Sequence, residues 1–343
     1  MADAGFEPAR VAADLLRQPI DAVEAIAGSG RNSRIYRVRA GGQSLCLKHY
    51  VTSGADPRDR LGTEMDALEL MTRHGIAQVP KPVARDAAQG CALMRWIDGV
   101  QVDAPDGSDI DAAAQFLAAV HALSRLDEAG RQPLGSEACL SGAEIVRQLG
   151  HRSERLAALR QDEPRLADFL QRYARFFGAS VLPQVSEGYR ARGWRFDAPL
   201  AVASRSLCPS DFGFHNALRS ADGLVFLDFD YFGWDDPVKL VADFILHPGM
   251  ALGDSLKRRF AGAARQIYGA DGTFAPRLNL LFPLFALRWC LILLNEYLPE
   301  RWATRLHAGL QDDWTSVKRG QLERAQALLE LTENTFPRFP YDV

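Results

Sequence analysis

Apolar residues follow two different periods along the chain, and the change between them falls near Gly99. Before this residue, short segments alternate apolar and polar side chains, as Arg34–Arg39 does, which is typical of half-buried strands. After it, apolar residues recur every three or four positions over longer segments, which is typical of helices. The pattern therefore predicts a strand-rich region at residues 1–98 and a mainly helical region at residues 99–343.

The individual elements follow from the same pattern and from the glycines and prolines that interrupt it. The expected strands are 23–27, 34–39, 44–50 and 91–99, and residues 79–82 are expected to be extended. The expected helices are 7–16, 57–74, 112–123, 141–159, 164–177, 239–247, 256–268, 278–298 and 311–332. Only the first two of these helices accompany the strands, and the others belong to the second region.

Within the helical region, the turn Ser220–Gly223 predicts a strand hairpin, because Asp-Gly between apolar runs is a hairpin signal. If Arg219 pairs with Leu224, then Asn216 and Asp228 lie at the same open end of the hairpin. Directly paired residues are about 5 Å apart. Both side chains could therefore reach one cation.

Asp211 precedes Asn216 by five residues. One carboxylate that accepts a hydroxyl proton, with an asparagine and an aspartate that bind magnesium, is the equipment of kinase-type phosphoryl transfer. The alternative interpretation is structural, since Asp and Asn are common in loops because they favour turns. The kinase interpretation therefore requires a phosphate-binding loop and a lysine earlier in the chain.

Both features occur earlier in the chain and in this order. A turn that contains Gly28 and Gly30 separates two expected antiparallel strands, and its backbone N–H groups could approach phosphates. Lys48 lies on the next strand, and Glu64, on the helix that follows, could pair with it. The alternatives are that the glycine turn is an ordinary hairpin and that Lys48 and Glu64 are solvated side chains. Two other acidic residues of the same helix are rival partners for the lysine: Asp66 and Glu69.

Composition narrows the function classes. The chain has 343 residues, 47% of them hydrophobic and 24% charged, and a formal net charge of −3. This charge gives no electrostatic case for binding nucleic acid or an anionic membrane surface. The five cysteines are scattered and lack Cys-x-x-Cys spacing, so we expect a reducing, cytoplasmic compartment and no zinc site.

The longest apolar run, Leu280–Leu294, does not predict a membrane span. It contains Pro283 and Arg288, and it is too short to cross about 30 Å of hydrocarbon. We expect a buried helix in which Arg288 and Trp289 pack in the core with one internal ion pair. A contribution of these two residues to an acceptor pocket is the alternative.

Several motifs resemble one family in colinear order, from about Val23 to Leu298. They are Gly28–Ser33, Leu47-Lys48, Glu64, Met94–Gly99, Val120–Leu123, Asp211–Asn216, Leu227–Asp230 and Asp236-Pro237. The chain resembles the aminoglycoside phosphotransferase and choline kinase branch of the protein-kinase-like fold. The resemblance implies an α+β, bilobal fold, with a small antiparallel-sheet N-lobe, a large mainly helical C-lobe and ATP between them.

The resemblance also implies roles for individual residues. Asp211 is the expected catalytic base, and Asn216 and Asp228 are the expected magnesium ligands. Lys48 is expected to contact the α- and β-phosphates, and Glu64 to fix its position. The other residues expected to contact the nucleotide are Gly28, Gly30, Asn32, Ser33, Met94 and Trp96.

The chain departs from the family pattern beside the catalytic aspartate. Pro209-Ser210 stands where the family usually has His-Gly, which puts the packing of the loop in doubt. Phe212–His215 replaces the usual residues before the asparagine but keeps the spacing. Lys239 lies near a position where aspartate is usual, and Asp243 is a candidate for that structural role.

The sequence therefore predicts an ATP- and Mg²⁺-dependent kinase that transfers the γ-phosphate to a hydroxyl of a sugar, an amino alcohol or a related metabolite. The alternative is a catalytically silent nucleotide-binding protein that acts by interaction, which the Pro209-Ser210 departure motivates. Nucleotidyl transfer on the same fold is disfavoured by the presence of Lys48, Glu64 and Asp211. The acceptor and the choice between ATP and GTP stay open.

Overall fold

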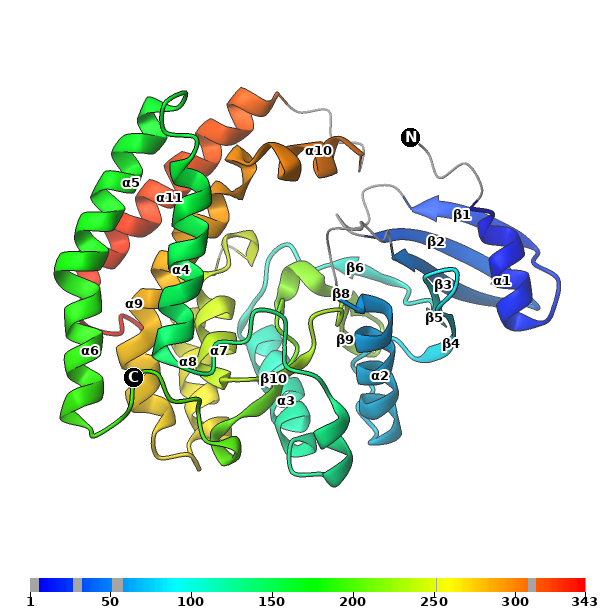
Figure 1. Cartoon of the computed structure of the whole chain (residues 1–343). Helices are drawn as coiled ribbons and strands as arrows, with labels where there is room; N and C mark the ends of the chain where they lie inside the picture. The colour runs from blue at the N-terminus through cyan, green and yellow to red at the C-terminus, as the bar shows by residue number, and fades with distance from the viewer. Residues whose placement is uncertain (1–5, 27–32, 51–57, 251, 308–312, 343) are drawn as a thin grey trace. The chain divides into compact units, whose positions relative to one another are not determined.

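The computed structural model describes residues 6–26, 33–50, 58–250, 252–307 and 313–342. The chain divides into two compact units (Figure 1). The first unit comprises residues 1–136, 207–234 and 307–309, and the second comprises residues 137–206, 235–306 and 310–343. The whole region 1–98 lies in the first unit. A functional division into lobes at residue 98 stays a prediction.

The first unit contains a five-stranded antiparallel sheet with strand order β1-β2-β3-β5-β4. Its strands are β1 (Ala22–Ile26), β2 (Ser33–Ala40), β3 (Gln43–Tyr50), β4 (Pro82–Asp86) and β5 (Cys91–Arg95). Four of these were predicted, within a few residues at their ends. The predicted strand 91–99 ends at Arg95, and β6 (Gly99–Gln101) follows as a separate strand.

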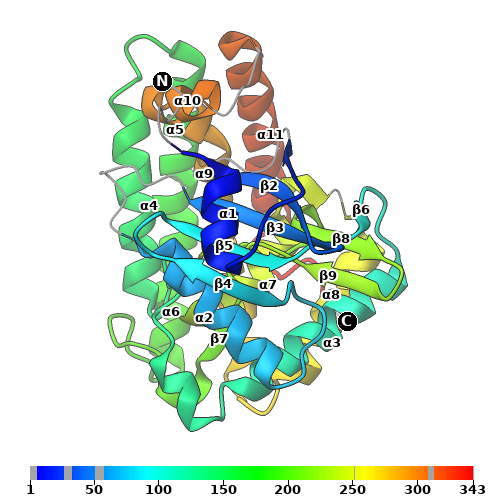
Figure 2. The same ribbon diagram turned by 90° about the vertical axis from the view of Figure 1, so that its right-hand side faces the viewer.

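Two helices pack on opposite faces of this sheet because side chains alternate along β3. Leu45 and Leu47 share a buried cluster with Val11 of α1 (Pro8–Leu16), which crosses the sheet in Figure 2. Lys48 points to the other face, where it meets α2 (Arg60–Arg73). The sheet therefore has an apolar face that packs against α1 and an opposite face on which Lys48 contacts α2.

The predicted hairpin forms with the predicted register. β8 (Ala217–Ser220) pairs with β9 (Gly223–Phe226), and Arg219 lies opposite Leu224. β6 adds to the other side of β8, which gives the order β6-β8-β9. The turn ends at Gly223 with φ of 113°, a conformation that favours glycine.

Helix α3 (Gly107–Leu123) supports this hairpin and begins earlier than the predicted residue 112. Asp106 and Asp109 form a capping box that satisfies the backbone donors of the first turn. Asp109 also accepts two hydrogen bonds from Arg219, at 2.8 and 2.9 Å. Further short elements are η1 (Asp127–Arg131), β7 (Ser206–Cys208), η4 (Phe214–Asn216) and β10 (Gly233–Asp235).

The second unit is helical. Its helices are α4 (Gly142–Ala157), α5 (Pro164–Phe176), α6 (Leu182–Ala191), α7 (Pro237–Leu246), α8 (Asp254–Tyr268), α9 (Phe274–Leu293), α10 (Pro299–His307) and α11 (Trp314–Thr335), with the short turns η2 (Phe177–Val181), η3 (Val202–Ser204), η5 (Pro248–Met250) and η6 (Leu294–Tyr297). The sequence pattern missed α6, because Pro183 normally ends a helix. Here the π-helical turn η2 places this proline in the first turn of α6, where no N–H is needed.

Helix α9 lies in the core of the second unit. Together with η6 it is long and apolar enough, by length and composition, to span a membrane. However, 72% of the apolar segment that meets these criteria is buried within the protein. Arg288 donates to Glu137 at 2.6 Å and lies 3.4 Å from Asp243. Trp289 donates to Asp243 at 2.7 Å. The predicted internal ion pair is thus confirmed, and Arg288 has two acidic partners.

Asp243 also pairs with Lys239, which tests the structural role expected for Asp243. The Lys239 ammonium is buried and lies 3.0 Å from Asp235 and 3.7 Å from Asp243. Burial alone lowers the pKa of Lys239, but these two carboxylates outweigh it and raise the pKa above its ordinary value. Asp243 therefore has a structural role in the second unit, as expected.

Candidate active site

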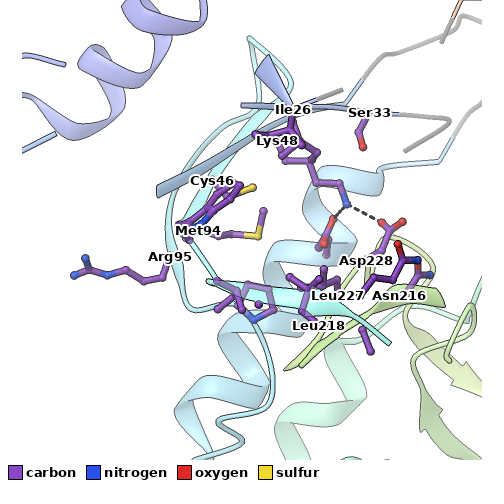
Figure 3. A pocket seen from close by; sticks show the side chains of 18 of the residues that line it. Ile26, Ser33, Cys46, Lys48, Met94, Arg95, Asn216, Leu218, Leu227 and Asp228 are labelled. Carbon is purple, nitrogen blue, oxygen red and sulfur yellow. Dashed lines mark hydrogen bonds and ion pairs between the residues drawn. The ribbon is translucent and has the colours of Figure 1, made fainter. Parts of the chain in front are cut away.

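The open end of the β8–β9 hairpin brings Asn216 and Asp228 together. The backbone N–H of Leu227 donates to the carbonyl of Asn216 at 2.8 Å, which extends the strand pairing to this point. Asp228 has φ of 65°, a left-handed conformation that is uncommon for a residue with a side chain. Such strain is typical of functional sites. Figure 3 shows the two side chains next to each other.

Lys48 joins this end of the hairpin to α2. Its ammonium donates to Glu64 at 2.5 Å and to Asp228 at 2.7 Å (Figure 3). Burial lowers the pKa of Lys48, but the carboxylates of Asp228 and Glu64 outweigh that effect and raise the pKa well above its ordinary value. The predicted pairing of Lys48 with Glu64 is thus confirmed.

The rival partners of Lys48 point elsewhere. Asp66 lies 2.5 Å and Glu69 lies 4.0 Å from the guanidinium of Arg85. Of these three acidic residues, Glu64 is the one that contacts Lys48, and its side chain is 2% exposed.

Tyr50 is a member of the site that the sequence analysis missed. Its hydroxyl donates to Glu64 at 2.5 Å, and the backbone N–H of Phe229 donates to the other oxygen of Glu64 at 3.3 Å. Burial, and then the charge of Glu64, raise the pKa of Tyr50 well above its ordinary value. Alternation along the strand could have revealed Tyr50, since it follows Lys48 by two residues and shares its face.

Asp211 and Asn216 are held together within one loop. The side-chain N–H of Asn216 donates to the carbonyl oxygen of Asp211 at 3.0 Å. Nε2 of His215 lies 3.1 Å from Oδ1 of Asp211. The Asp211 side chain is 44% exposed, so it is accessible to a reactant from solvent. The contact with His215 was not predicted.

A cavity of about 490 Å³ lies beside Lys48, Asn216 and Asp228, and Asp211 is not among the residues that line it. Its volume is within the range of about 300–1,000 Å³ that is usual for small-molecule sites. Its apolar lining includes Ile26, Ile35, Met94, Trp96, Leu218 and Leu227, and its polar lining includes Ser33, Lys48, Glu64, His215, Asn216 and Asp228. Of the predicted nucleotide contacts, Ser33, Met94 and Trp96 therefore line the cavity. Gly28, Gly30 and Asn32 lie outside the described residues.

The residues present fit a magnesium ion. Asn216 uses its amide nitrogen to bind Asp211, so its amide oxygen is the atom left for a cation. Asp228 uses Oδ1 to bind Lys48, and its Oδ2 accepts no hydrogen bond from the residues that the structure describes. Carboxylate and amide oxygens are the ligands that hard divalent cations prefer. These roles remain predictions.

The sequence was compared with models of known protein families. The model of the phosphotransferase enzyme family matches residues 23–278, which is most of the chain. The chain belongs to this family. No curated protein matches the sequence.

Solved structures share the fold of this phosphotransferase. The spectinomycin phosphotransferase complex with ADP and spectinomycin has a TM-score of 0.60 at 12% identity, over 93% of this chain and 97% of that one. Choline kinase from Cryptosporidium parvum has a TM-score of 0.59 at 9% identity, over 92% and 91%. A choline/ethanolamine kinase family protein from Mesorhizobium loti has a TM-score of 0.55 at 18% identity, over 90% and 88%. These likenesses confirm the predicted protein-kinase-like fold.

In this phosphotransferase, Ser210 shows how the altered loop is held. Ser210 has φ of 63°, and its hydroxyl donates to the carbonyl of Tyr231 at 2.7 Å. The backbone N–H of Ser136 donates to the same carbonyl at 3.2 Å. A hydroxyl thus fastens the segment before Asp211 to the segment after Asp228, although the usual His-Gly is replaced.

Asp230 is a further acidic residue beside the site. It is buried, and its carboxylate lies 3.9 Å from Nε of Arg60 on α2. Burial, followed by the charge of Asp228, raises the pKa of Asp230 to about 7. Asp230 and Glu64 both link the 228–231 segment to α2, so the position of this helix depends on that segment.

Proposed function

We propose that this phosphotransferase transfers the γ-phosphate of ATP, with Mg²⁺, to a hydroxyl group of a small metabolite. The observation that carries the proposal is the position of Lys48. Its ammonium lies between the buried Glu64 and the hairpin-end Asp228, at the polar side of a cavity of suitable volume. An ammonium in this place can bind phosphate oxygens while Glu64 holds it.

The residues divide the remaining tasks by their chemistry. Asn216 and Asp228 would hold Mg²⁺, whose charge offsets that of the phosphates. Asp211 would orient the acceptor hydroxyl and accept its proton late in the reaction. Because phosphoryl transfer needs little covalent help from the protein, positioning and charge neutralisation supply most of the acceleration.

The family and the named neighbours support the proposed acceptor class. Those neighbours include choline kinases and a spectinomycin phosphotransferase, and choline and spectinomycin are small molecules that carry hydroxyl groups. Two neighbours contain ADP or AMP-PNP, which supports an adenine nucleotide as the donor. We therefore propose a sugar, an amino alcohol or a related metabolite as the acceptor.

Two further features support an active enzyme in the cytoplasm. All five cysteines lie within the described residues and none of them forms a disulfide, which agrees with a reducing compartment. The bond from Ser210 to Tyr231 replaces the packing that the departure at Pro209-Ser210 put in doubt. This bond favours an active kinase over a catalytically silent protein.

Calorimetric titration tests the proposal at its nucleotide site. ATP should bind the wild-type protein more tightly with Mg²⁺ than with EDTA, and Asp228→Asn should remove this difference. GTP titrated in parallel decides the base preference. Equal binding of ATP by both proteins, with and without Mg²⁺, contradicts the assignment of Asp228.

A further inference from the structure

The loop that carries Asp211 is anchored from one side by aromatic residues. Phe212 and Phe214 are buried, and the ring of Phe212 packs against Phe116 and Phe226 at centroid distances of 5.5 and 4.8 Å. The backbone N–H of Asn216 donates to the carbonyl of Gly213 at 3.0 Å and closes a 3₁₀ turn. The backbone around His215 is therefore fixed by packing and by the turn.

The polar side chains of the loop contact each other. His215 is 17% exposed, and its Nε2 lies 3.1 Å from Oδ1 of Asp211. A carboxylate has no hydrogen to give, so the imidazole donates its Nε2–H in this bond. A side chain held by a fixed backbone thus restrains the rotation of the half-exposed Asp211 carboxylate.

We propose that His215 is a positioning residue, which holds the carboxylate of Asp211 in the orientation that receives the proton of the acceptor hydroxyl. The proposal rests on the proposed function of Asp211 and adds a residue to it. Orientation matters because a misplacement of about 1 Å can lower a rate by about a hundredfold.

The test compares two substitutions at His215, one control substitution elsewhere and one double variant. His215→Leu removes the donor with little change in volume, and His215→Gln places an amide N–H near the position of Nε2. His74→Leu is the matched control, because Nε2 of His74 makes the same kind of contact with Glu128 outside the site. Asp211→Asn/His215→Leu tests whether His215 acts through Asp211.

The measurement is the rate of γ-phosphate transfer from Mg-ATP to water and to a metabolite pool. We expect His215→Leu to lower kcat about tenfold or more, as the loss of a hydrogen bond to a charged group does. His215→Gln should recover most of the loss, and His74→Leu should match the wild type. In the Asp211→Asn background, His215→Leu should have no further effect.

Two results overturn the proposal while leaving the proposed function intact. One is a wild-type kcat for His215→Leu. The other is an equal loss of kcat when His215→Leu is introduced into the wild type and into the Asp211→Asn variant. A wild-type protein that binds no nucleotide and transfers no phosphate contradicts the proposed function, and this inference falls with it.

An NMR measurement tests the hydrogen bond without using activity. In spectra of ¹⁵N-labelled imidazoles, His215 should have its proton on Nε2, and the Nε2–H signal should shift in Asp211→Asn. If the proton of neutral His215 is found on Nδ1 and not on Nε2, the proposal is overturned.

Discussion

At the scale of single residues, the buried ammonium of Lys48 determines the electrostatics of the candidate site. Its side chain is 7% exposed and contacts two carboxylates. A buried charge is tolerated only when it is paired and hydrogen-bonded. Glu64 has two more donors, Tyr50 and the N–H of Phe229, so its position does not depend on Lys48 alone.

Replacement of Lys48 by methionine should weaken the binding of Mg-ATP about tenfold or more, because hydrogen bonds to charged groups contribute about 1.5–3 kcal/mol. Glu64 keeps its other donors, so the protein should remain folded. Calorimetry measures the affinity and circular dichroism the fold. Lys81→Met is the control, because Lys81 is exposed. Unchanged affinity in Lys48→Met contradicts the role given to this residue.

Replacement of Asp211 by asparagine should separate turnover from binding. We expect kcat to fall by about 10²–10⁴, the usual contribution of a general base. Nucleotide affinity should stay near that of the wild type, since the proposed role of Asp211 is toward the acceptor and not the nucleotide. Steady-state kinetics and calorimetry measure the two quantities. The exposed turn residue Asp222 gives the control, Asp222→Asn. Wild-type turnover in Asp211→Asn excludes Asp211 as the base.

Glu137 should make the stability of the second unit depend on pH. Its pKa is lowered from 4.5 to about 2, because Arg288 and Arg152 outweigh the opposite effect of burial. A lowered pKa stabilises the folded state above pH 4.5, and this contribution is lost as the pH falls toward 2. The side chain is 46% exposed, so solvent screening keeps the effect modest.

Glu137→Gln should therefore lower the midpoint of thermal unfolding at pH 7, and its difference from the wild type should shrink as the pH is lowered below 4.5. Calorimetry across this range measures the difference. The control is Glu330→Gln, at an exposed position of α11. A difference that is constant with pH shows that Glu137 acts through shape and not through its charge.

At the scale of elements, α3 and the β8–β9 hairpin depend on each other through Asp109. This carboxylate caps the helix and binds Arg219 of β8, and it is 3% exposed. The hairpin in turn determines where Asn216 and Asp228 meet. Asp109 thus acts on the site through the position of the hairpin.

Asp109→Asn should lower the free energy of unfolding by about 1–3 kcal/mol, because a cap and a charge-assisted pair are both weakened. Urea unfolding measures the loss. Arg219→Met should cost less than Asp109→Asn, since Arg219 is 42% exposed and the cap remains. The double variant should be less destabilised than the sum of the two. Additive losses contradict the coupling.

The hairpin also shows what the sequence could predict. Its register followed from the Asp-Gly turn, because a one-residue shift would move every side chain to the other face. Asp106, which starts α3, was overlooked because apolar period alone does not locate a cap. Helix α6 was missed because Pro183 is read as an end unless the preceding π turn is known.

At the scale of the whole molecule, the candidate site combines segments that are distant in sequence. Lys48 comes from β3, Glu64 from α2, and Asp211 and Asp228 from either side of the hairpin. The sequence motifs pointed to these residues because the proposed chemistry requires their types and order. No motif marks Tyr50 or His215. Strand alternation places Tyr50 on the face of Lys48, but the contact of His215 with Asp211 is seen only in the folded chain.

Together, these residues are proposed to transfer phosphate to a small hydroxylated molecule. Incubation of the protein with γ-labelled Mg-ATP and a metabolite pool, followed by mass spectrometry, tests it most directly. We expect a labelled phosphorylated metabolite that requires Mg²⁺ and forms about 10²–10⁴ times more slowly with Asp211→Asn. Transfer of the label to no acceptor and to no water by a protein that is folded would contradict it.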